Sequence, residues 1–525
     1  MNLTEESVKK IIKRTKSKSC ELDPLPTVLV KLCINELCPI ITSIVNASLN
    51  SKTMPDTLKK AIVRPLIKKP SLEPILKNYR PVSNLAYISK VIEEAVEQQI
   101  AQHIETHGLA DPLQSAYKTG HSTETALLKM CNDILLELDS GKAVCLGMLD
   151  LSAAFDTVDH GILLRRLRET FNITGDVAKW LESYLSNRTV QVCINDTYSD
   201  PVELDCSLPQ GSQMGPKRYS DYVRPLGRLL HVLQLLYHCY ADDTQAGKSF
   251  EPKKEHTQVA AVKDLEYGIN EIAQWMRMNR LKLNRDKTEF IVFVTKHDKK
   301  HIGIKELQLD SDIIPSVPVV RNLGVHMDEH LSFDQHIAYL CKICFMYLGW
   351  IKKIRHLMTF EATKTLVHAL IMARLDYCNS LFTGLPQCAF DRLQRIMNAA
   401  ARVISGASRR DRITPILKKL HWLPMRERCQ FKTLTLIFKS INGTAPKYLR
   451  DIVNPYSPKR TLRSKSSNCL EIIRTKKQLG TRSFQYAGAK LWNELPEDIK
   501  SSQSLAVFKK SLKTYLFIKV YGNES

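Results

Sequence analysis

An apolar run that ends in an acidic residue sets the strongest limit on how this chain folds. The run Ala143–Leu149 is followed directly by Asp150, a pattern typical of a buried strand whose last residue emerges at a sheet edge. Farther along, Tyr237–Ala241 leads into Asp242 and Asp243, a polar pair that suits a hairpin turn. Because helical patterns alternate with these strands, we predict an α+β domain.

The three acidic residues are also the strongest candidates for chemistry. Carboxylates at strand ends supply the hard oxygen ligands that Mg²⁺ prefers. Two such ions flank a reacting phosphorus and stabilise both the attacking and the leaving oxygen, and phosphoryl transfer needs positioning more than a protein nucleophile. An Asp-Asp pair in a turn is by itself usually a solvated loop, so the flanking residues decide between the two interpretations.

Positive charge is concentrated in the last quarter of the chain. The 525 residues carry a net charge of +22. Residues 401–525 contain 26 Lys and Arg against 8 Asp and Glu, whereas residues 1–400 contain 50 against 46. This basic segment indicates a polyanionic partner, because counterion release from phosphates drives such binding; a solvated surface or a localisation patch is the alternative. Several aromatic residues interleave with these charges and are candidates either for base stacking or for the core: Trp422, Phe431, Tyr448, Trp492 and Tyr515.

Other features exclude several classes of protein. The apolar runs, such as Ala143–Leu149, fall far short of the ~20 residues that cross a bilayer, and the N-terminus lacks the basic and apolar regions of a secretory signal. We therefore expect an intracellular protein without a membrane partner. The 14 cysteines are scattered, as in a reducing compartment. Cys341 and Cys344 lack a second pair, so we expect half-buried thiols on a helix and no structural zinc.

Periodic apolar residues predict the remaining elements. We expect helices over residues 1–50, 84–104, 120–139, 162–167, 265–276 and 328–404, and strands over residues 189–195 and 287–294. Asn84 is expected to cap the helix that follows it, and Asp156 the helix that begins near Ile162. The basic segment shows no clear period over long stretches.

Several blocks of residues together resemble one family. Leu149–His160, Leu208–Ser212 and Tyr240–Gln245 closely resemble motifs A, B and C of reverse transcriptases, in the same order and spacing. Further blocks resemble non-LTR (LINE-type) retrotransposon polymerases, and those of jockey-type elements most: Asn78–Asn84, Ser115–Ala126, Leu281–Glu289, Arg321–Val325, Leu375–Ser380 and Leu420–Pro424. The resemblance extends from about Lys16 to about Phe517.

The resemblance implies a right-hand polymerase fold with fingers, palm and a helical thumb, followed by a basic C-terminal extension. The expected boundaries are an N-terminal helical segment over 1–50, a reverse transcriptase domain over 51–327 (fingers about 51–140, palm about 141–327), a thumb over 328–405 and a basic domain over 406–525.

The implied activity is RNA-directed DNA polymerisation, in which dNTPs are added to a primer 3′ end with two Mg²⁺ ions. The implied partners are an RNA template, a DNA primer or target and dNTPs, and the protein is expected in the nucleus or cytoplasm as a ribonucleoprotein. Such elements usually carry an upstream endonuclease. Nothing before Ser17 resembles one, so target nicking is expected to come from elsewhere or not to occur.

The resemblance also assigns catalytic roles. Asp150, Asp242 and Asp243 match the family's metal-binding aspartates, of which Asp243 is the least certain direct ligand, and the carbonyl of Leu151 would add an oxygen. Lys287 falls in a block where a lysine would protonate the departing pyrophosphate, although a lysine on an exposed strand is an equal interpretation.

Five further residues match nucleotide-binding positions. Phe155 matches a steric gate, whose ring would collide with a ribose 2′-OH; core packing is the alternative. Gln210 and Gly211 match the turn beneath the incoming nucleotide, where a side chain would obstruct close backbone approach. Arg80 and Lys68 would clamp the triphosphate, or are surface charges.

Some positions depart from the family pattern. Lys217 and Arg218 stand at normally apolar positions, and Gln213 replaces a usual valine. Ala246–Lys248 replaces an apolar strand, and Gly147 interrupts the strand before the first aspartate. Because burying an unpaired lysine destabilises a fold, these residues motivate an alternative function, that of a decayed copy that only binds nucleic acid. Another template-directed polymerase, such as an RNA-dependent RNA polymerase or an intron maturase, is a third interpretation. The Tyr240–Asp243 turn and Phe155 speak against the version that makes RNA.

Overall fold

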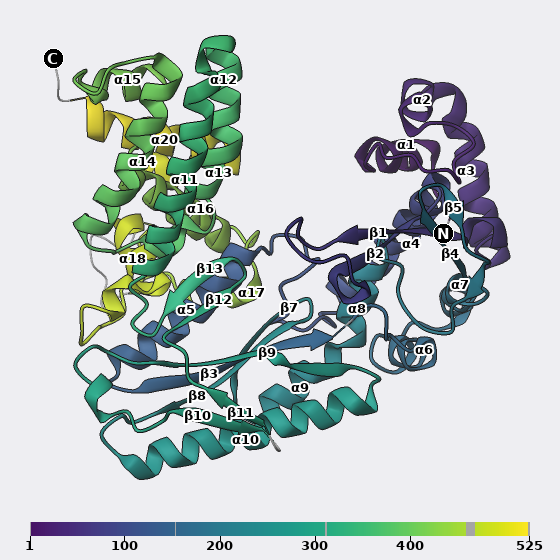
Figure 1. The fold of residues 1–525 in the computed structure, drawn as a ribbon, viewed down its shortest axis with the longest axis horizontal. Helices are drawn as coiled ribbons and strands as arrows, with labels where there is room; N and C mark the ends of the chain where they lie inside the picture. The colour runs from purple at the N-terminus through teal and green to yellow at the C-terminus, as the bar shows by residue number, and fades with distance from the viewer. Residues whose placement is uncertain (1, 153, 310–311, 458–467, 523–525) are drawn as a thin grey trace. The chain divides into compact units, whose positions relative to one another are not determined.

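The computed structural model describes residues 2–152, 154–309, 312–457 and 468–522 (Figure 1). The chain divides into two compact units. Unit 1 comprises Met1–Tyr117, Asp150–Leu233 and Glu271–Asn284, and unit 2 comprises Lys118–Leu149, Gln234–Asn270 and Arg285–Ser525. The mixture of helices and strands confirms the predicted α+β class. In the described ranges, no helix combines the length and the apolar character needed to span a bilayer. The boundaries of fingers, palm, thumb and basic domain stay predictions.

Unit 1 is built mainly of helices. They are α1 (Glu5–Arg14), α2 (Thr27–Leu32), α3 (Ile34–Ser51), α4 (Tyr87–Thr106), α6 (His160–Glu169), α7 (Gly175–Leu185), α8 (Gly215–Tyr222) and α9 (Arg224–Val232). The helices predicted near the N-terminus and over 84–104 are thus confirmed. The predicted cap is wrong, because Asn84 ends a strand and Asp23, distant in sequence, accepts the hydrogen bond of the Tyr87 N–H at 2.5 Å. A partner so far away leaves no local signal.

A small sheet completes unit 1. Strand β1 (Ala61–Ile67) pairs antiparallel with β2 (Tyr79–Asn84) and parallel with β4 (Thr189–Ile194). Strand β4 also pairs with β5 (Thr197–Tyr198) and β6 (Val202–Glu203). Asn195 and Asp196, both with positive φ, form the turn that joins β4 to β5.

A second sheet, mostly in unit 2, carries the strands expected to present the acidic residues. Its order is β7 (Leu236–Tyr240), β8 (Asp243–Phe250), β3 (Ala143–Ser152) and β9 (Lys282–Phe293). Strands β7 and β8 form the predicted hairpin, and β3 pairs antiparallel with β8. The long helix α10 (Glu255–Met278) runs along one face of this sheet (Figure 1).

The glycines in these strands permit close packing. A Cβ built on Gly147 would lie 3.1 Å from Ile269 Cδ1 of α10, and one on Gly247 would lie 2.7 Å from the Cys145 carbonyl oxygen. Lys248 is not buried unpaired, because its Nζ lies 3.4 Å from Asp264 Oδ2. The unusual residues of β3 and β8 are therefore accommodated by the sheet and the helix that covers it.

The rest of unit 2 consists of two hairpins and a large set of helices. The hairpins are β10 (Glu306–Leu309) with β11 (Asp312–Pro315), and β12 (Val319–Asn322) with β13 (Val325–Asp328). The helices are α5 (Thr123–Asp139), α11 (Asp334–Ile354), α12 (Phe360–Val367), α13 (Ala373–Leu375), α14 (Gln387–Ser405), α15 (Ile413–Lys419), α16 (Met425–Ile441), α17 (Lys447–Arg450), α18 (Phe484–Asn493), α19 (Glu497–Lys500) and α20 (Leu505–Tyr521).

The helical prediction for residues 328–404 is confirmed. The basic segment, for which the pattern showed no clear period, also forms helices. Cys341 and Cys344 lie on the helix α11, as predicted. Cys341 is half-buried, as expected, but Cys344 is fully buried.

Most of the aromatic residues considered for base stacking belong to the core. The side chains of Trp422, Tyr448 and Trp492 are at most 4% exposed. Trp492 contacts Phe508, whose ring also stacks on Phe438. These three candidates are therefore unavailable to bases.

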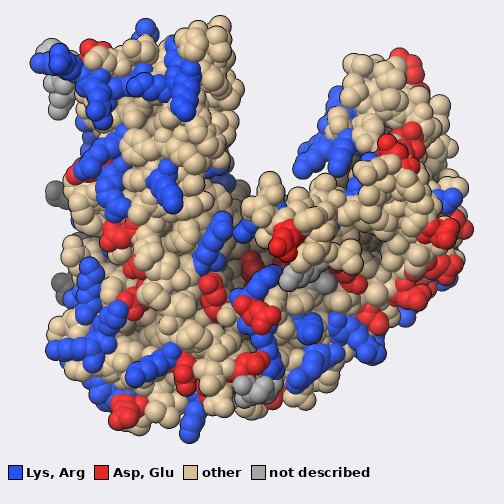
Figure 2. All heavy atoms as spheres, viewed as in Figure 1, with Lys and Arg blue, Asp and Glu red and all other residues tan. Residues whose placement is uncertain are grey.

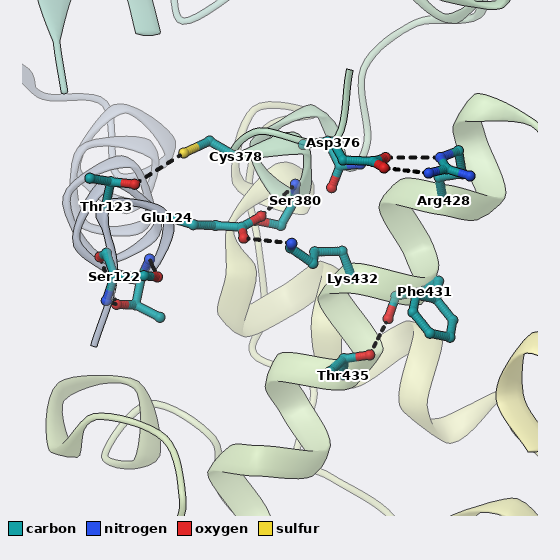
Figure 3. A network of polar contacts seen from close by, with 12 residues as sticks. Ser122, Thr123, Glu124, Asp376, Cys378, Ser380, Arg428, Phe431, Lys432 and Thr435 are labelled. Carbon is teal, nitrogen blue, oxygen red and sulfur yellow. Dashed lines mark hydrogen bonds and ion pairs between the residues drawn. The ribbon is translucent and has the colours of Figure 1, made fainter. Parts of the chain in front are cut away.

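Two blocks that were recognised in the sequence contact each other within unit 2 (Figure 3). Glu124, in the first turn of α5, accepts hydrogen bonds from the Ser380 hydroxyl at 2.7 Å and its N–H at 3.2 Å. Lys432 of α16 lies 3.2 Å from the same carboxylate, and the neighbouring Arg428 binds Asp376 through two nitrogens. The family resemblance in these blocks thus corresponds to a polar network that joins three segments of the unit.

Candidate active site

The sheet register fixes where the three candidate catalytic aspartates stand in the chain. Asp242 lies in the turn between β7 and β8, and Asp243 is the first residue of β8. Strand β3 pairs with β8 up to Leu149, which stands opposite Thr244. Asp150 follows Leu149 in β3, just as Asp243 precedes Thr244 in β8. The predicted hairpin turn at Asp242 is confirmed, whereas β3 does not end at Asp150 but continues to Ser152. A shared metal site for the three carboxylates stays a prediction.

The surroundings of these aspartates are polar and half-buried. All three side chains are partly exposed, and Leu151, the residue after Asp150, is buried. Asn284 of β9 donates a hydrogen bond to Asp150 Oδ2 at 3.2 Å. Within the described ranges, no three His, Cys, Asp or Glu side chains form a group that could hold a metal ion.

The loop that carries Gln210 and Gly211 is pressed against strand β2 of unit 1. The Ser83 N–H donates to the Gln210 carbonyl oxygen at 3.1 Å. A Cβ on Gly211 would lie only 2.1 Å from the Ser83 carbonyl oxygen, so only glycine fits here. The sequence predicted that another group approaches the backbone of Gly211 closely, and in the structure this group is the backbone of Ser83 in β2. The approach of a nucleotide to the same turn stays a prediction.

The candidate gate residue lies beside this loop. The Phe155 ring is half-buried and stacks on the Tyr219 ring of α8, with centroids 4.7 Å apart. The Phe155 carbonyl accepts from the Leu208 N–H at 2.9 Å, and Gln210 Nε2 donates to Asp156 Oδ1 at 3.2 Å. The candidate gate and the nucleotide loop are thus joined by backbone and side-chain hydrogen bonds.

The cap predicted for the next helix is wrong. Asp159, rather than Asp156, caps α6, because its Oδ1 accepts from the Ile162 N–H at 2.8 Å. Asp156 faces Gln210 instead, and its burial raises the pKa of its carboxyl group.

The remaining candidates are exposed residues that lie on a strand or, in the case of Lys68, directly after one. Arg80 of β2 stands opposite Leu66 of β1, and the Lys68 N–H donates to the Asn78 carbonyl at 2.8 Å. The hairpin therefore brings the two candidate triphosphate-binding side chains to one end of the unit 1 sheet. Lys287 is exposed on β9. The roles of all three stay predictions.

The helix after the nucleotide loop contains a buried charge cluster. Arg218 of α8 is 1% exposed, and its guanidinium lies 2.9 Å from Glu97 and 3.1 Å from Asp221. Lys217 is partly exposed and lies 3.4 Å from the same Glu97 carboxylate. The two charges at normally apolar positions are therefore paired rather than stranded.

Sequence reasoning gave no role to two residues that contact the candidate site. Asn284 lies in a block that resembles the family, but nothing in its neighbours pointed to Asp150. Glu93 of α4 is fully buried and accepts from the Gln213 N–H at 2.6 Å. A signal did exist for Glu93, because two acidic residues four positions apart, Glu93 and Glu97, interrupt the apolar stripe of a helix.

The strand ends, the glycine loop and the aromatic stack lie within a part of the chain that matches a known family. Residues 67–327 match the family model described as reverse transcriptase (RNA-dependent DNA polymerase). This part of the chain is therefore a reverse transcriptase domain. Within that class, the chain is related to the RNA-directed DNA polymerases of jockey and similar non-LTR transposons.

Three relatives illustrate the relationship. The chain is 25% identical over 83% of its length to "Probable RNA-directed DNA polymerase from transposon X-element" of Drosophila melanogaster. It is 25% identical over 76% to the corresponding protein of transposon BS, and 22% identical over 77% to "RNA-directed DNA polymerase from mobile element jockey" of the same organism. The matches cover 46%, 44% and 44% of these proteins, so the chain spans less than half the length of these relatives.

Among solved structures, a telomerase from Candida Tropicalis matches 58% of this chain and 60% of its own. Its TM-score is 0.37 and its sequence identity 11%, too low a similarity to support an inference.

Proposed function

We propose that this chain is an RNA-directed DNA polymerase that adds dNTPs to a primer 3′ end on an RNA template. The observation that supports this most directly is the register of the second sheet. Leu149 of β3 stands opposite Thr244 of β8. Asp150 directly follows Leu149, and Asp242 and Asp243 directly precede Thr244. The family resemblance assigns metal binding for phosphoryl transfer to these three aspartates.

Divalent metal fits the donor set of these residues. Three carboxylates and the Leu151 carbonyl are all oxygen donors, which suit Mg²⁺ rather than a thiolate-binding metal. When bound, Mg²⁺ would lower the pKa of the primer hydroxyl and neutralise charge on the α-phosphate. Asn284 would keep the Asp150 carboxylate oriented through its hydrogen bond.

The other residues of the chain would bind and select the nucleotide. Gln210 and Gly211 would form the floor beneath the base and sugar, and Phe155 would exclude a 2′-hydroxyl. Arg80 and Lys68 would neutralise the triphosphate, because exposed cations on one strand hairpin are suited to phosphate. Lys287 would donate a proton to pyrophosphate.

The alternative function, a decayed copy that only binds nucleic acid, rested on residues that looked costly to bury. Lys217, Arg218 and Lys248 each have an acidic partner within 3.4 Å, and Gly147 accommodates α10. The charged residues at these places are therefore paired rather than buried alone, which favours the enzyme.

Primer extension on poly(rA)/oligo(dT) with Mg²⁺ tests the proposal. We expect extension by the wild-type chain and its loss in Asp242→Asn. Asp200→Asn removes an exposed carboxylate elsewhere in unit 1 and should extend normally. Retained RNA binding without any wild-type extension would support the decayed copy instead.

A further inference from the structure

A buried carboxylate lies directly beneath the nucleotide loop of unit 1. Glu93 of α4 is 0% exposed. Its Oε2 accepts from the N–H of Gln213 at 2.6 Å and from the N–H of Met214 at 3.4 Å, and the Ser89 hydroxyl donates to Oε1 at 3.3 Å. A buried carboxylate is strongly destabilising unless its oxygens are hydrogen-bonded, and here the loop itself supplies most of the donors.

The charge of Glu93 has a buried counterpart. Arg188 is 1% exposed, and its positive charge favours the ionised form of Glu93, opposing the burial that raises the pKa of this carboxyl group. The Arg188 guanidinium lies over the Tyr184 ring, 4.8 Å from its centroid, and donates to the Tyr184 carbonyl at 3.0 Å. The Tyr184 hydroxyl in turn donates to Ser212 Oγ at 3.3 Å. Helix α7 thus contacts the loop at the residue next to those that Glu93 holds.

The loop is held at both ends. On one side, the Ser83 N–H of β2 binds the Gln210 carbonyl. On the other, Ser212 Oγ accepts from the Gly215 N–H at 2.6 Å, where α8 begins. Glu93 binds the two N–H groups between these points. Because Gly211 has no side chain to pack, the position of this turn depends on such backbone contacts.

The next acidic residue of α4 holds the helix that follows the loop. Glu97, one turn after Glu93, lies 2.9 Å from Arg218 and 3.4 Å from Lys217 of α8. The side chain of Tyr219, beside Arg218, stacks on the candidate gate Phe155. Helix α4 thus fixes the loop through one carboxylate and α8 through the other.

We propose that Glu93 is a positioning residue for dNTP binding, acting through the backbone of the Gln210–Met214 loop rather than by contact with the nucleotide. The inference rests on the proposed polymerase function, because only that function gives the loop a nucleotide to bind. Glu93→Gln removes the negative charge and leaves a single acceptor oxygen, so the hydrogen bonds from the Gln213 and Met214 N–H groups lose their charge assistance. The turn should then shift, and dNTP affinity should fall while primer–template affinity stays unchanged.

Binding of the complementary dNTP is measured first, on a complex of protein, RNA template and dideoxy-terminated primer, in which no turnover is required. We expect the Kd of the dNTP to rise about tenfold in Glu93→Gln, as for the loss of one charge-assisted hydrogen bond. Glu94→Gln is the matched control, because Glu94 is the adjacent residue of α4 and its carboxylate accepts from Gln98 Nε2 at 3.0 Å rather than from the loop. The Kd of the dNTP for Glu94→Gln should equal its Kd for the wild type.

Amide hydrogen exchange gives a second readout that is independent of nucleotide. The Gln213 and Met214 amides should exchange faster in Glu93→Gln but not in Glu94→Gln. Glu93→Asp keeps the charge near Arg188 but withdraws the carboxylate by one methylene, so it serves if Glu93→Gln does not fold. In steady-state extension, KM for dNTP should rise more than kcat falls.

Unchanged dNTP Kd, or an equal loss of dNTP and primer–template affinity, would overturn the inference. A wild-type complex that binds dNTP tightly but never extends the primer would overturn the proposed function alone, and the binding comparison would still decide the role of Glu93.

Discussion

At the scale of single residues, Arg218 shows how a charge is tolerated inside unit 1. Its guanidinium lies between Glu97 and Asp221, and two of its nitrogens, Nε and Nη1, are buried without a hydrogen-bond partner. Such an arrangement is only partly satisfied, so its contribution to stability depends on keeping both charges present. We therefore expect the loss of either Arg218 or Glu97 alone to destabilise unit 1 more than the loss of both.

This leads to a stability prediction. Arg218→Leu should lower the free energy of unfolding by about 3–5 kcal/mol, because it leaves the Glu97 carboxylate buried with only the partly exposed Lys217 as partner. The double variant Glu97→Leu/Arg218→Leu should recover most of that loss, as measured by urea denaturation. If the double variant were as unstable as the single one, the pairing would not explain how Arg218 is buried.

The stack of Phe155 on Tyr219 makes a second residue-scale prediction. Phe155→Ala removes the ring that would meet a 2′-hydroxyl, so incorporation of rNTPs relative to dNTPs should rise by an order of magnitude or more, about 1.4 kcal/mol of discrimination per factor of ten. Tyr219→Phe keeps the stacked ring and is the control. Unchanged sugar selectivity in Phe155→Ala would remove the gate assignment and leave Phe155 as a packing residue.

At the scale of elements, helix α11 has an unusual exposed face. Its exposed side chains include Tyr339 (41%), Phe345 (46%) and Trp350 (54%), with Lys342 and Lys353 between and beyond them. Aromatic rings interleaved with cations suit contact with nucleic acid. Figure 2 shows further Lys and Arg side chains over the helices of unit 2, with few Asp or Glu among them; Arg409, Arg410 and Lys419 are exposed near α15.

We expect α11 to contact the primer–template duplex. Trp350→Ala should weaken duplex binding by about 1–3 kcal/mol, the range for loss of a stacked ring. Lys342→Gln/Lys353→Gln should also flatten the dependence of log Kd on log salt concentration, because fewer counterions are released. Gel-shift titrations at ~50 and ~200 mM salt measure both effects. A salt dependence identical to that of wild type would place the contact elsewhere.

The elements also show what periodicity alone can predict. The strand before Asp150, the β7–β8 hairpin and helices α4, α5 and α11 follow apolar patterns that tertiary packing reinforces. The hairpins β10–β11 and β12–β13 were not predicted, because strands of four residues are too short for a pattern to be read. The register that aligns β3 with β8 and the hydrogen bonds to Glu93 are long-range, and no local pattern contains them.

At the scale of the whole molecule, the basic C-terminal segment is part of unit 2 rather than an appendage. Asp139, at the end of α5, accepts from the backbone N–H groups of Lys476 and Lys477, the shorter contact being 2.6 Å. Tyr448 of α17 donates to Thr125 Oγ1 at 2.9 Å, and its ring meets the buried His238 edge-on at 5.1 Å. Burial lowers the pKa of His238 to about 3, so this contact is between neutral rings.

His238 lies on β7, four residues before Asp242, which ties the C-terminal segment to the strand that leads into the acidic turn. Deleting residues 406–525 would therefore expose α5 and one side of β7 as well as remove positive charge. We expect the truncated chain to lose cooperative thermal unfolding and primer extension together.

A matched full-length variant in which exposed Arg409, Arg410 and Lys419 are replaced by Gln should keep its melting temperature and lose only RNA affinity. A truncated chain that melts like the wild type and extends primers would instead make the segment a separate RNA-binding domain.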